Sequence, residues 1–278
     1  MDLFKELGER GHEQVSFFHD SDSGLKGLVA IHNTVLGPAL GGCRMWNYEN
    51  EREALVDVLR LSKGMTYKAA IAGLNLGGGK AVILGDSKTQ KTENLFRSFG
   101  RFVEGLGGRY ITAEDVGTSI KDMEHVRMET DYVTGISQAL GGSGDPSPVT
   151  AYGVFVGIKA SVKERLNKTD LDGLKVSIQG LGHVGMSLCE YLHKEGVKLI
   201  VTDIDQAVMG QAVDKFGATP VEPDGIYEMD VDVYAPCALG ATVNPETIDK
   251  LKCTIIAGSA NNQLIENNFG VELKKRNI

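Results

Sequence analysis

A glycine-rich turn in the second half of the chain constrains the fold more than any other feature. Gly180, Gly182 and Gly185 follow an apolar run over residues 174–179 that is typical of a strand. A helical pattern follows them, and another apolar run leads from it to Asp203. A strand, a Gly-x-Gly-x-x-Gly turn, a helix and a second strand with an acidic end predict a dinucleotide-binding βαβ unit.

Each part of this turn has a physical role in binding a dinucleotide. Gly180 makes the tight turn, Gly182 lets the backbone approach the pyrophosphate, and Gly185 lets the helix pack closely on the sheet. The helix N-terminus faces the phosphates. Asp203 accepts hydrogen bonds from the ribose hydroxyls and would repel a 2′-phosphate, and no arginine follows it directly. We therefore expect NAD rather than NADP, bound also by Leu181, His183 and Val184.

The order of the expected elements predicts an α/β protein with two domains. Strands alternate with helices from residue 174 onward, which predicts a doubly wound parallel sheet. The first half begins with an expected hairpin over residues 14–32, whose edges are a candidate subunit contact. Residues 141–148 contain three Gly and two Pro, which no helix or strand interior accommodates. We therefore expect a substrate and oligomerisation domain over 1–145 and a Rossmann-type nucleotide-binding domain over 146–278.

Composition excludes several classes of protein. The net charge of -8 argues against a nucleic-acid partner or an anionic membrane surface. No apolar run is long enough to span a bilayer, and the first residues do not resemble an export signal. None of the four cysteines stands at C-x-x-C spacing, so metal and redox motifs are absent. We therefore expect a soluble cytoplasmic protein with reduced thiols and no metal.

A second glycine-rich stretch, Gly77–Lys80, precedes the apolar residues 81–84, which predict a buried strand. We expect the glycines to form a loop and Lys80 to stand at the start of the strand. Partial removal from water favours the neutral amine that base chemistry requires. A turn followed by a lysine with a solvated head explains the stretch equally well.

Lys68 and Asp115 are candidates for the same site as Lys80. Lys68 lies near the end of a helix expected from Asn50 to about Ile71, and Asp115 follows an expected strand. Consecutive elements are usually neighbours, and α/β sheets place ligand groups beyond the carboxyl ends of their strands. One lysine could hold the carboxylate of an amino acid, the other could act as base, and the aspartate could carry protons. Each residue is also compatible with a solvated charge or a structural ion pair.

Several motifs occur in the order typical of the amino-acid dehydrogenases of the glutamate/leucine/phenylalanine/valine group. The chain resembles this family over essentially its whole length, and its leucine-specific branch most closely. The resemblance implies a homo-oligomeric enzyme that oxidatively deaminates an L-amino acid with NAD, producing a 2-oxo acid and ammonia. The motifs that carry it cover residues 36–42, 63–68, 77–80, 112–117 and 258–264.

The resemblance also assigns roles to individual residues. It implies that Lys68 binds the substrate carboxylate and that Lys80 is the base that helps water attack the imine. It implies that Asp115 shuttles protons to the departing amine and that Asn262 reaches the substrate from the cofactor side. Further substrate contacts implied in this way are Leu40, Gly41, Gly42, Met65, Ala113 and Thr134. Further cofactor contacts are Thr150, Cys237, Ala238 and Asn261.

The substrate side chain is suggested by Ala113, where relatives specific for phenylalanine tend to carry glycine. The methyl group shrinks the pocket, which favours leucine, valine or isoleucine over an aromatic ring. Cys43 and the segment 272–278, by contrast, are similar to phenylalanine dehydrogenases. Two alternatives therefore stay open: a phenylalanine dehydrogenase, and a non-catalytic relative that binds NAD or an amino acid. A hydroxyacid dehydrogenase is not supported, because no motif pairs a histidine with a carboxylate.

Two departures from the family pattern stand out. His183 replaces the asparagine usual in the phosphate turn, which we expect NAD to tolerate because the backbone binds it. The family's C-terminal segment, which completes the cofactor domain and the pocket wall, is absent after Ile278. We therefore expect weak or absent turnover from the chain as it stands.

Overall fold

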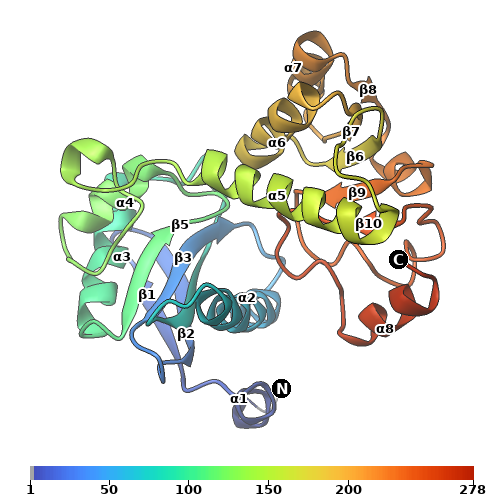
Figure 1. Ribbon diagram of the computed structural model, residues 1–278. Coiled ribbons are helices and arrows are strands. Elements are labelled where there is room, and N and C mark those ends of the chain that lie inside the picture. Colours follow the sequence, from blue (N-terminus) through green and yellow to red (C-terminus); the bar gives the residue numbers. More distant parts are fainter. Residues whose placement is uncertain (1–2) are drawn as a thin grey trace. The chain divides into compact units, whose positions relative to one another are not determined.

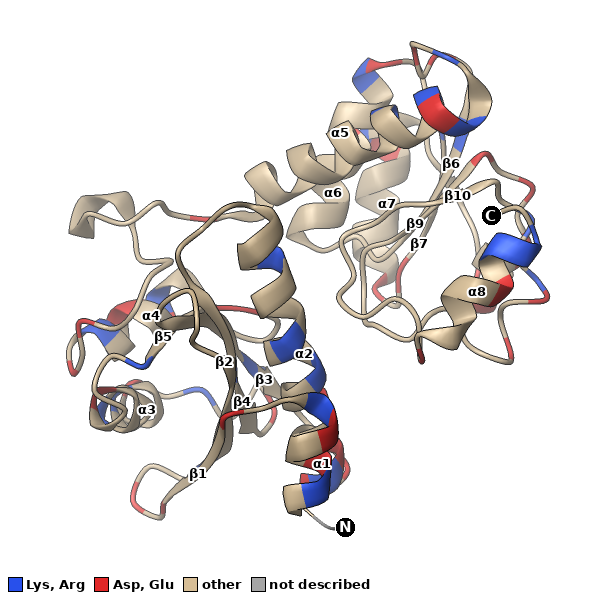
Figure 2. Cartoon of the chain, turned by 60° about the horizontal axis from the view of Figure 1, so that its bottom comes forward, with Lys and Arg blue, Asp and Glu red and all other residues tan. Residues whose placement is uncertain are grey.

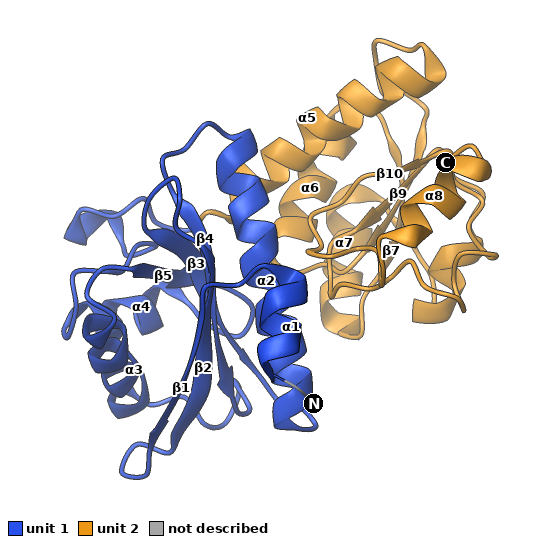
Figure 3. Cartoon of the chain, turned by 90° about the horizontal axis from the view of Figure 1, so that it is seen from below, with its two compact units in different colours: residues 1–145 blue, residues 146–278 orange. Residues whose placement is uncertain are grey.

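The chain forms two compact units, of which unit 1 ends at Asp145 and unit 2 begins at Pro146. The structure is a computed structural model that describes residues 3–278 (Figure 1). Each unit contains one five-stranded sheet and its own hydrophobic core (Figure 3). No helix within the described residues is both long and apolar enough to cross a bilayer.

The sheet of unit 1 is mixed, with strand order β1-β2-β4-β3-β5. The expected hairpin is formed by β1 and β2, whose antiparallel register pairs Gln14 with Ile31 and Asp20 with Leu25. β4 runs antiparallel to β2, whereas β3 runs parallel to both β4 and β5. The strands are β1 (Gln14–Asp20), β2 (Leu25–Asn33), β3 (Ala39–Trp46), β4 (Gly77–Leu84) and β5 (Tyr110–Glu114).

Helices cover both faces of this sheet because the side chains of its central strands alternate. Leu28 and Ala30 of β2 pack against α2, whereas Val29 and Ile31 of the same strand face the cluster that contains α3 and α4. Asn50 caps α2 by accepting a hydrogen bond from the Glu53 amide at 3.0 Å. The helices are α1 (Leu3–Arg10), α2 (Glu51–Ile71), α3 (Glu93–Gly105) and α4 (Ile120–Arg127).

One local expectation for unit 1 is wrong. The glycines at 77–79 do not form a loop, because they lie inside β4 and pair with β3 and β2. Their small size serves packing: a Cβ atom on Gly78 would lie 2.2 Å from the Thr66 amide of α2. Beside β5, Val133 forms one isolated bridge with Thr112, after which Gly135 turns the chain with a φ of 73°.

The sheet of unit 2 is entirely parallel, with strand order β10-β9-β6-β7-β8, as expected for a doubly wound fold. Its strands are β6 (Lys175–Gln179), β7 (Lys198–Thr202), β8 (Thr219–Pro220), β9 (Val233–Pro236) and β10 (Ile255–Ile256). Its α-helices are α5 (Ser147–Leu166), α6 (His183–Lys194), α7 (Gln206–Phe216) and α8 (Asn268–Lys275). Two short 3-10 helices, η1 (Gln138–Leu140) in unit 1 and η2 (Pro223–Glu228) in unit 2, complete the fold.

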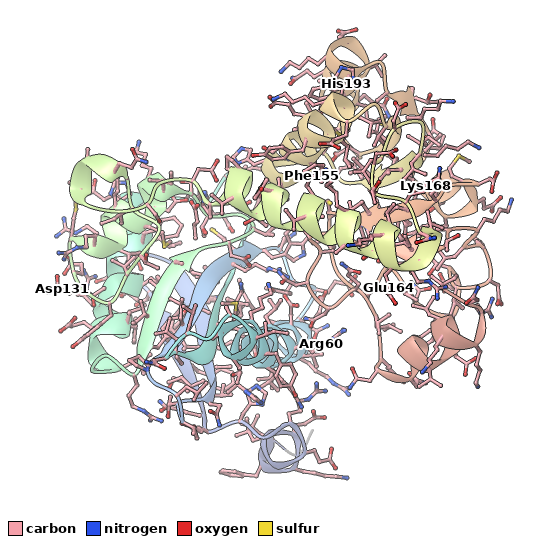
Figure 4. The ribbon with its side chains drawn as sticks, in the orientation of Figure 1. Arg60, Asp131, Phe155, Glu164, Lys168 and His193 are labelled. Carbon is pink, nitrogen blue, oxygen red and sulfur yellow. The ribbon has the colours of Figure 1, made fainter. Side chains whose placement is uncertain are left out.

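The helices α5 and α6 pack against each other through aromatic side chains. Phe155 of α5, labelled in Figure 4, stacks on Tyr191 of α6 with ring centroids 5.6 Å apart. Both belong to the main hydrophobic cluster of unit 2, which also contains the strands β6 and β7. In the chain, α6 begins shortly after the carboxyl end of β6, and the glycine-rich turn joins the two elements.

Candidate active site

The centre of the candidate site in unit 1 is an ion pair between Lys80 and Asp115. Lys80 extends from β4 with a side chain that is 5% exposed, and its Nζ lies 3.0 Å from Asp115 Oδ2. Asp115 follows β5 directly. Because β3 separates β4 from β5 in the sheet, both side chains reach across one intervening strand. The sheet order therefore brings together two residues that are distant in the sequence.

Arg44, on that intervening strand, is a third member of the cluster. Its Nε lies 3.0 Å from Asp115 Oδ2, and its Nη1 lies 2.8 Å from Asp57 Oδ2. Asp57 also accepts a hydrogen bond of 2.7 Å from the Tyr48 hydroxyl. Sequence reasoning missed Arg44, Asp57 and Tyr48. The available signal was an arginine inside an apolar strand, which needs a buried carboxylate partner.

The Asp115 carboxyl is kept ionised by its neighbours. Burial by itself would raise its pKa, but the positive charges of Lys80 and Arg44 outweigh this effect and lower the pKa to about 2. Asp115 is therefore a carboxylate throughout the neutral range. Such a group can accept a proton from a neighbour but carries none itself until its surroundings change.

Lys68 lies in the last turn of α2, a helix that carries basic residues along its length (Figure 2). Burial lowers the pKa of its ammonium, and the positive charge of Lys80 lowers it further. The two lysines are therefore close enough for their charges to interact. A carboxylate bound beside Lys68 would favour its charged form.

The residues Leu40, Gly41 and Gly42 lie on β3 beside the cluster. A Cβ atom on Gly41 would lie 3.3 Å from Met65 Cγ of α2, and one on Gly42 would lie 2.9 Å from the Cβ of Asp115. The space beside both glycines is filled by protein atoms, because a Cβ atom on Gly41 would also lie 1.7 Å from the Gly79 carbonyl oxygen and one on Gly42 would lie 2.4 Å from the Glu114 carbonyl oxygen. Both positions therefore need glycine for the neighbouring backbone to pack closely against β3.

Ala113 lies on β5, next to β3, and Thr134 follows the bridge that Val133 forms with β5. Ala113 pairs with Gly42 in the register of β5 with β3, and the Thr134 amide donates 2.8 Å to the Thr112 carbonyl. The structure thus brings together in unit 1 the residues predicted to contact substrate, except Asn262. Asn262 belongs to unit 2, where its φ of 50° is stabilised by a bond from the Ala241 amide to its carbonyl.

The glycine-rich turn of unit 2 has the geometry of a nucleotide cradle. Gly180 has a φ of 97°, and a Cβ atom on Gly185 would lie 2.0 Å from the Gly180 carbonyl oxygen. A Cβ on Gly182, by contrast, would meet no atom within 4 Å, and no side chain caps α6 there. Two glycines are therefore required by the protein itself, and the third leaves the helix N-terminus open to a phosphate.

Asp203 follows β7 beside this turn. Its Oδ2 accepts a hydrogen bond of 2.6 Å from the Leu181 amide, and its Oδ1 accepts one of 2.9 Å from the Asp205 amide. These two bonds fix the carboxylate next to the phosphate turn, whose last two positions before the third glycine are His183 and Val184. A ribose that binds here meets a fixed negative charge.

The other residues predicted to contact cofactor follow the neighbouring strands or begin α5. The Cys237 amide donates 2.7 Å to the Gln179 carbonyl, and Ala238 would contact a Cβ on Gly180. Asn261 follows β10, and Thr150 lies near the start of α5. Within residues 3–278, no group of three His, Cys, Asp or Glu side chains is arranged to hold a metal ion.

Comparison with known proteins places both units in one family. Residues 12–132 match the model for the Glu/Leu/Phe/Val dehydrogenase dimerisation domain, and residues 141–209 match the model for the Glutamate/Leucine/Phenylalanine/Valine dehydrogenases. The chain is 56% identical to the leucine dehydrogenase of Bacillus subtilis (strain 168) over all of its length and 76% of that protein's. It is 49% identical to the phenylalanine dehydrogenase of Bacillus thermotolerans over 99% of its length and 73% of that protein's.

A solved structure shares the fold as well as the sequence. The crystal structure of the L-tryptophan dehydrogenase of Nostoc punctiforme superposes with a TM-score of 0.73 at 47% identity. The match covers 99% of this chain and 79% of that one. Relatives that differ in substrate are thus all close, so likeness alone does not select the amino acid.

Proposed function

Because this chain belongs to the glutamate/leucine/phenylalanine/valine dehydrogenase family, we propose that it oxidatively deaminates a branched-chain L-amino acid with NAD. It is an amino-acid dehydrogenase of a family that uses a nicotinamide cofactor. The observation that carries the proposal is the buried Lys80–Asp115 ion pair with Lys68 electrostatically coupled to it. Two cations and one carboxylate suit a substrate that presents a carboxylate and an amine.

Each side chain takes one step of the reaction. Lys68 binds the α-carboxylate through its side-chain nitrogen. A bound nicotinamide would accept the hydride that leaves the substrate Cα. Lys80 takes a proton from the water that attacks the resulting imine carbon, and Asp115 relays a proton to the departing amine. The products are the 2-oxo acid and ammonia.

The branched-chain preference is supported by Ala113. Its methyl group stands opposite Gly42, where an aromatic ring would need more room than an isobutyl group. Cys43, a resemblance to phenylalanine dehydrogenases, is fully buried in the core of unit 1, so it offers no contact to a substrate side chain. This burial removes one argument for an aromatic substrate.

The preference for NAD is supported by Asp203. Both of its carboxylate oxygens are fixed by backbone amides at the end of β7. Moving a 2′-phosphate toward this carboxylate would bring like charges together in a partly buried site. Ribose hydroxyls, by contrast, can donate hydrogen bonds to it.

We also propose that the chain forms a homo-oligomer through the outer edge of the sheet in unit 1. β1 is an edge strand of that sheet, and Phe17 on it is 59% exposed. An exposed strand edge that carries a large apolar side chain is suited to pairing with another copy. Light scattering that finds only monomers at micromolar concentration contradicts this part of the proposal.

An NADH absorbance assay tests the reaction and its specificity. We expect kcat/KM to be higher for leucine, valine and isoleucine than for phenylalanine or tryptophan, and higher with NAD than with NADP. An aromatic preference would replace the branched-chain assignment by the phenylalanine alternative. NAD binding in calorimetry without NADH formation from any of these amino acids would support the non-catalytic alternative.

A further inference from the structure

The carboxylate of Asp115 is shared between two cations of different chemical character. Lys80 Nζ and Arg44 Nε each lie 3.0 Å from the same oxygen, Oδ2. A lysine that acts as base must pass through a neutral form, whereas a guanidinium remains charged in proteins. The charge on Asp115 therefore has one variable partner and one constant partner.

We propose that Arg44 is a positioning residue that fixes the Asp115 carboxylate against Lys80 throughout the reaction, and that Asp57 and Tyr48 hold Arg44 in place. This inference rests on the proposed roles of Lys80 and Asp115. It adds a second layer of residues behind the reacting ones, on β3 and α2.

Arg44 is built into the fold as a rigid anchor. It is 8% exposed in the middle of the sheet, and its Nη1 is held 2.8 Å from Asp57 on α2. The Tyr48 hydroxyl donates to the same Asp57 oxygen. A side chain with carboxylates on two sides loses little further freedom when it orients one of them.

The loop that carries Asp115 is tied to β3 on both sides of Arg44. The Thr118 hydroxyl donates 2.8 Å to the Cys43 carbonyl, and the Met45 amide donates 3.0 Å to the Val116 carbonyl. The Asp115 amide donates 2.9 Å to the Thr118 hydroxyl oxygen. Backbone and side-chain contacts from β3 thus hold both the Asp115 carboxylate and the loop that carries it. An isolated ion pair would not need this additional support.

The main test compares Arg44→Met and Arg44→Lys with the parent protein. We expect Arg44→Met to lower kcat at least tenfold with a smaller change in KM for leucine. The acid limb of the kcat profile should move to higher pH, because Asp115 loses a positive neighbour. Arg44→Lys should recover part of both effects. Arg97→Met is the matched control: Arg97 also pairs with two carboxylates, Glu93 and Glu129, away from the site. It should leave kcat and the profile unchanged.

Two further measurements decide the inference if Arg44→Met does not fold or the parent is inactive. Tyr48→Phe removes only one hydroxyl and should shift the acid limb in the same direction by a smaller amount. Carbon-13 NMR of the Asp115 carboxyl should show it protonating at higher pH in Arg44→Lys and Tyr48→Phe than in the parent. An inactive parent would support the non-catalytic alternative to the proposed function and would still leave this titration readable. Folded variants with unchanged kcat profile and unchanged Asp115 titration overturn the positioning role.

Discussion

The two units bury different kinds of polar group. Among the described residues, unit 1 buries charged or ionisable side chains, whereas the buried polar side chains of unit 2 are hydroxyls. Those of unit 1 include His32, Arg44, Lys80 and Asp122, and those of unit 2 are Ser177, Thr202, Thr242 and Thr247. Burying a charge costs free energy unless it is paired, so unit 1 maintains a network that unit 2 does not need.

This difference follows from what each unit is proposed to do. Unit 1 must hold ionisable groups away from water, because proton transfer depends on their altered surroundings. Unit 2 is proposed to bind a phosphate through backbone amides and a helix N-terminus, which requires close packing rather than side-chain charge. We therefore expect catalysis to be lost when a charge is removed from the Lys80–Asp115 cluster of unit 1. We expect NAD binding to be lost when a side chain is added to a tightly packed glycine in the turn of unit 2.

The largest expected effect comes from Lys80→Met in unit 1. Loss of the proposed base should lower kcat by about 10²–10⁴, while NAD binding in calorimetry stays unchanged. Lys91→Met is the control, since Lys91 also forms an ion pair in unit 1, with Asp122. A Lys80→Met variant that turns over at the parental rate would show that another group is the base.

The next effect concerns the backbone of unit 2. Gly185→Val adds atoms where a Cβ alone would lie 2.0 Å from the Gly180 carbonyl, so α6 must move away from the sheet. We expect NAD binding to be lost and unit 2 to be destabilised by roughly 1–3 kcal/mol. Gly210→Ala is the control, because a Cβ there meets no atom within 4 Å. Retained NAD affinity in Gly185→Val would contradict the view that unit 2 depends on close packing at this turn.

A smaller effect is expected from Ala113→Gly. Removing this methyl group should raise kcat/KM for phenylalanine relative to leucine by about 10–200-fold, the range that one methylene-sized contact can supply. The measurement is the ratio of kcat/KM for the two substrates. An unchanged ratio would show that Ala113 does not determine the choice between the two substrates.

The smallest effect is a pH dependence that should appear in unit 1 alone. Burial, together with the smaller effect of the neighbouring His32 charge, lowers the pKa of His12 from its ordinary value of 6.5 to about 4. The unfolded chain therefore binds more protons than the folded one between these values, so stability is lost as pH falls from about 6.5 to 4. Asp115, with a pKa of about 2, stays ionised in this range.

Hydrogen exchange at pH 7 and pH 5 measures this difference by region. We expect amides of β2 and α2 to lose protection at pH 5 more than amides of β6 and α6. The variant His12→Gln, which does not titrate, should lose less protection than the parent. Equal losses in the two units would contradict the idea that buried ionisable groups distinguish them.

Sequence patterns were sufficient where the decisive interactions are local. The strand–turn–helix around Gly180, the Asn50 cap of α2 and the hairpin of β1 and β2 depend on residues close in the chain, and the structure contains all three. The glycines at 77–79 were misassigned because α2 packs so closely that Gly78 has no room for a side chain. No local sequence pattern reveals a contact of this kind. The short bridge at Val133 depends likewise on a distant partner, Thr112.

The sequence by itself determined the α/β alternation, the nucleotide turn and the family, since these follow from periodicity and ordered motifs. Only the tertiary structure decided that Arg44 and Lys80 share one oxygen of Asp115, because the strand order β4-β3-β5 brings together segments that are far apart in the chain. It also assigned the lowered pKa to Lys68. The physical reason is that burial and charge coupling depend on neighbours in space, and those neighbours come from several elements of the sheet.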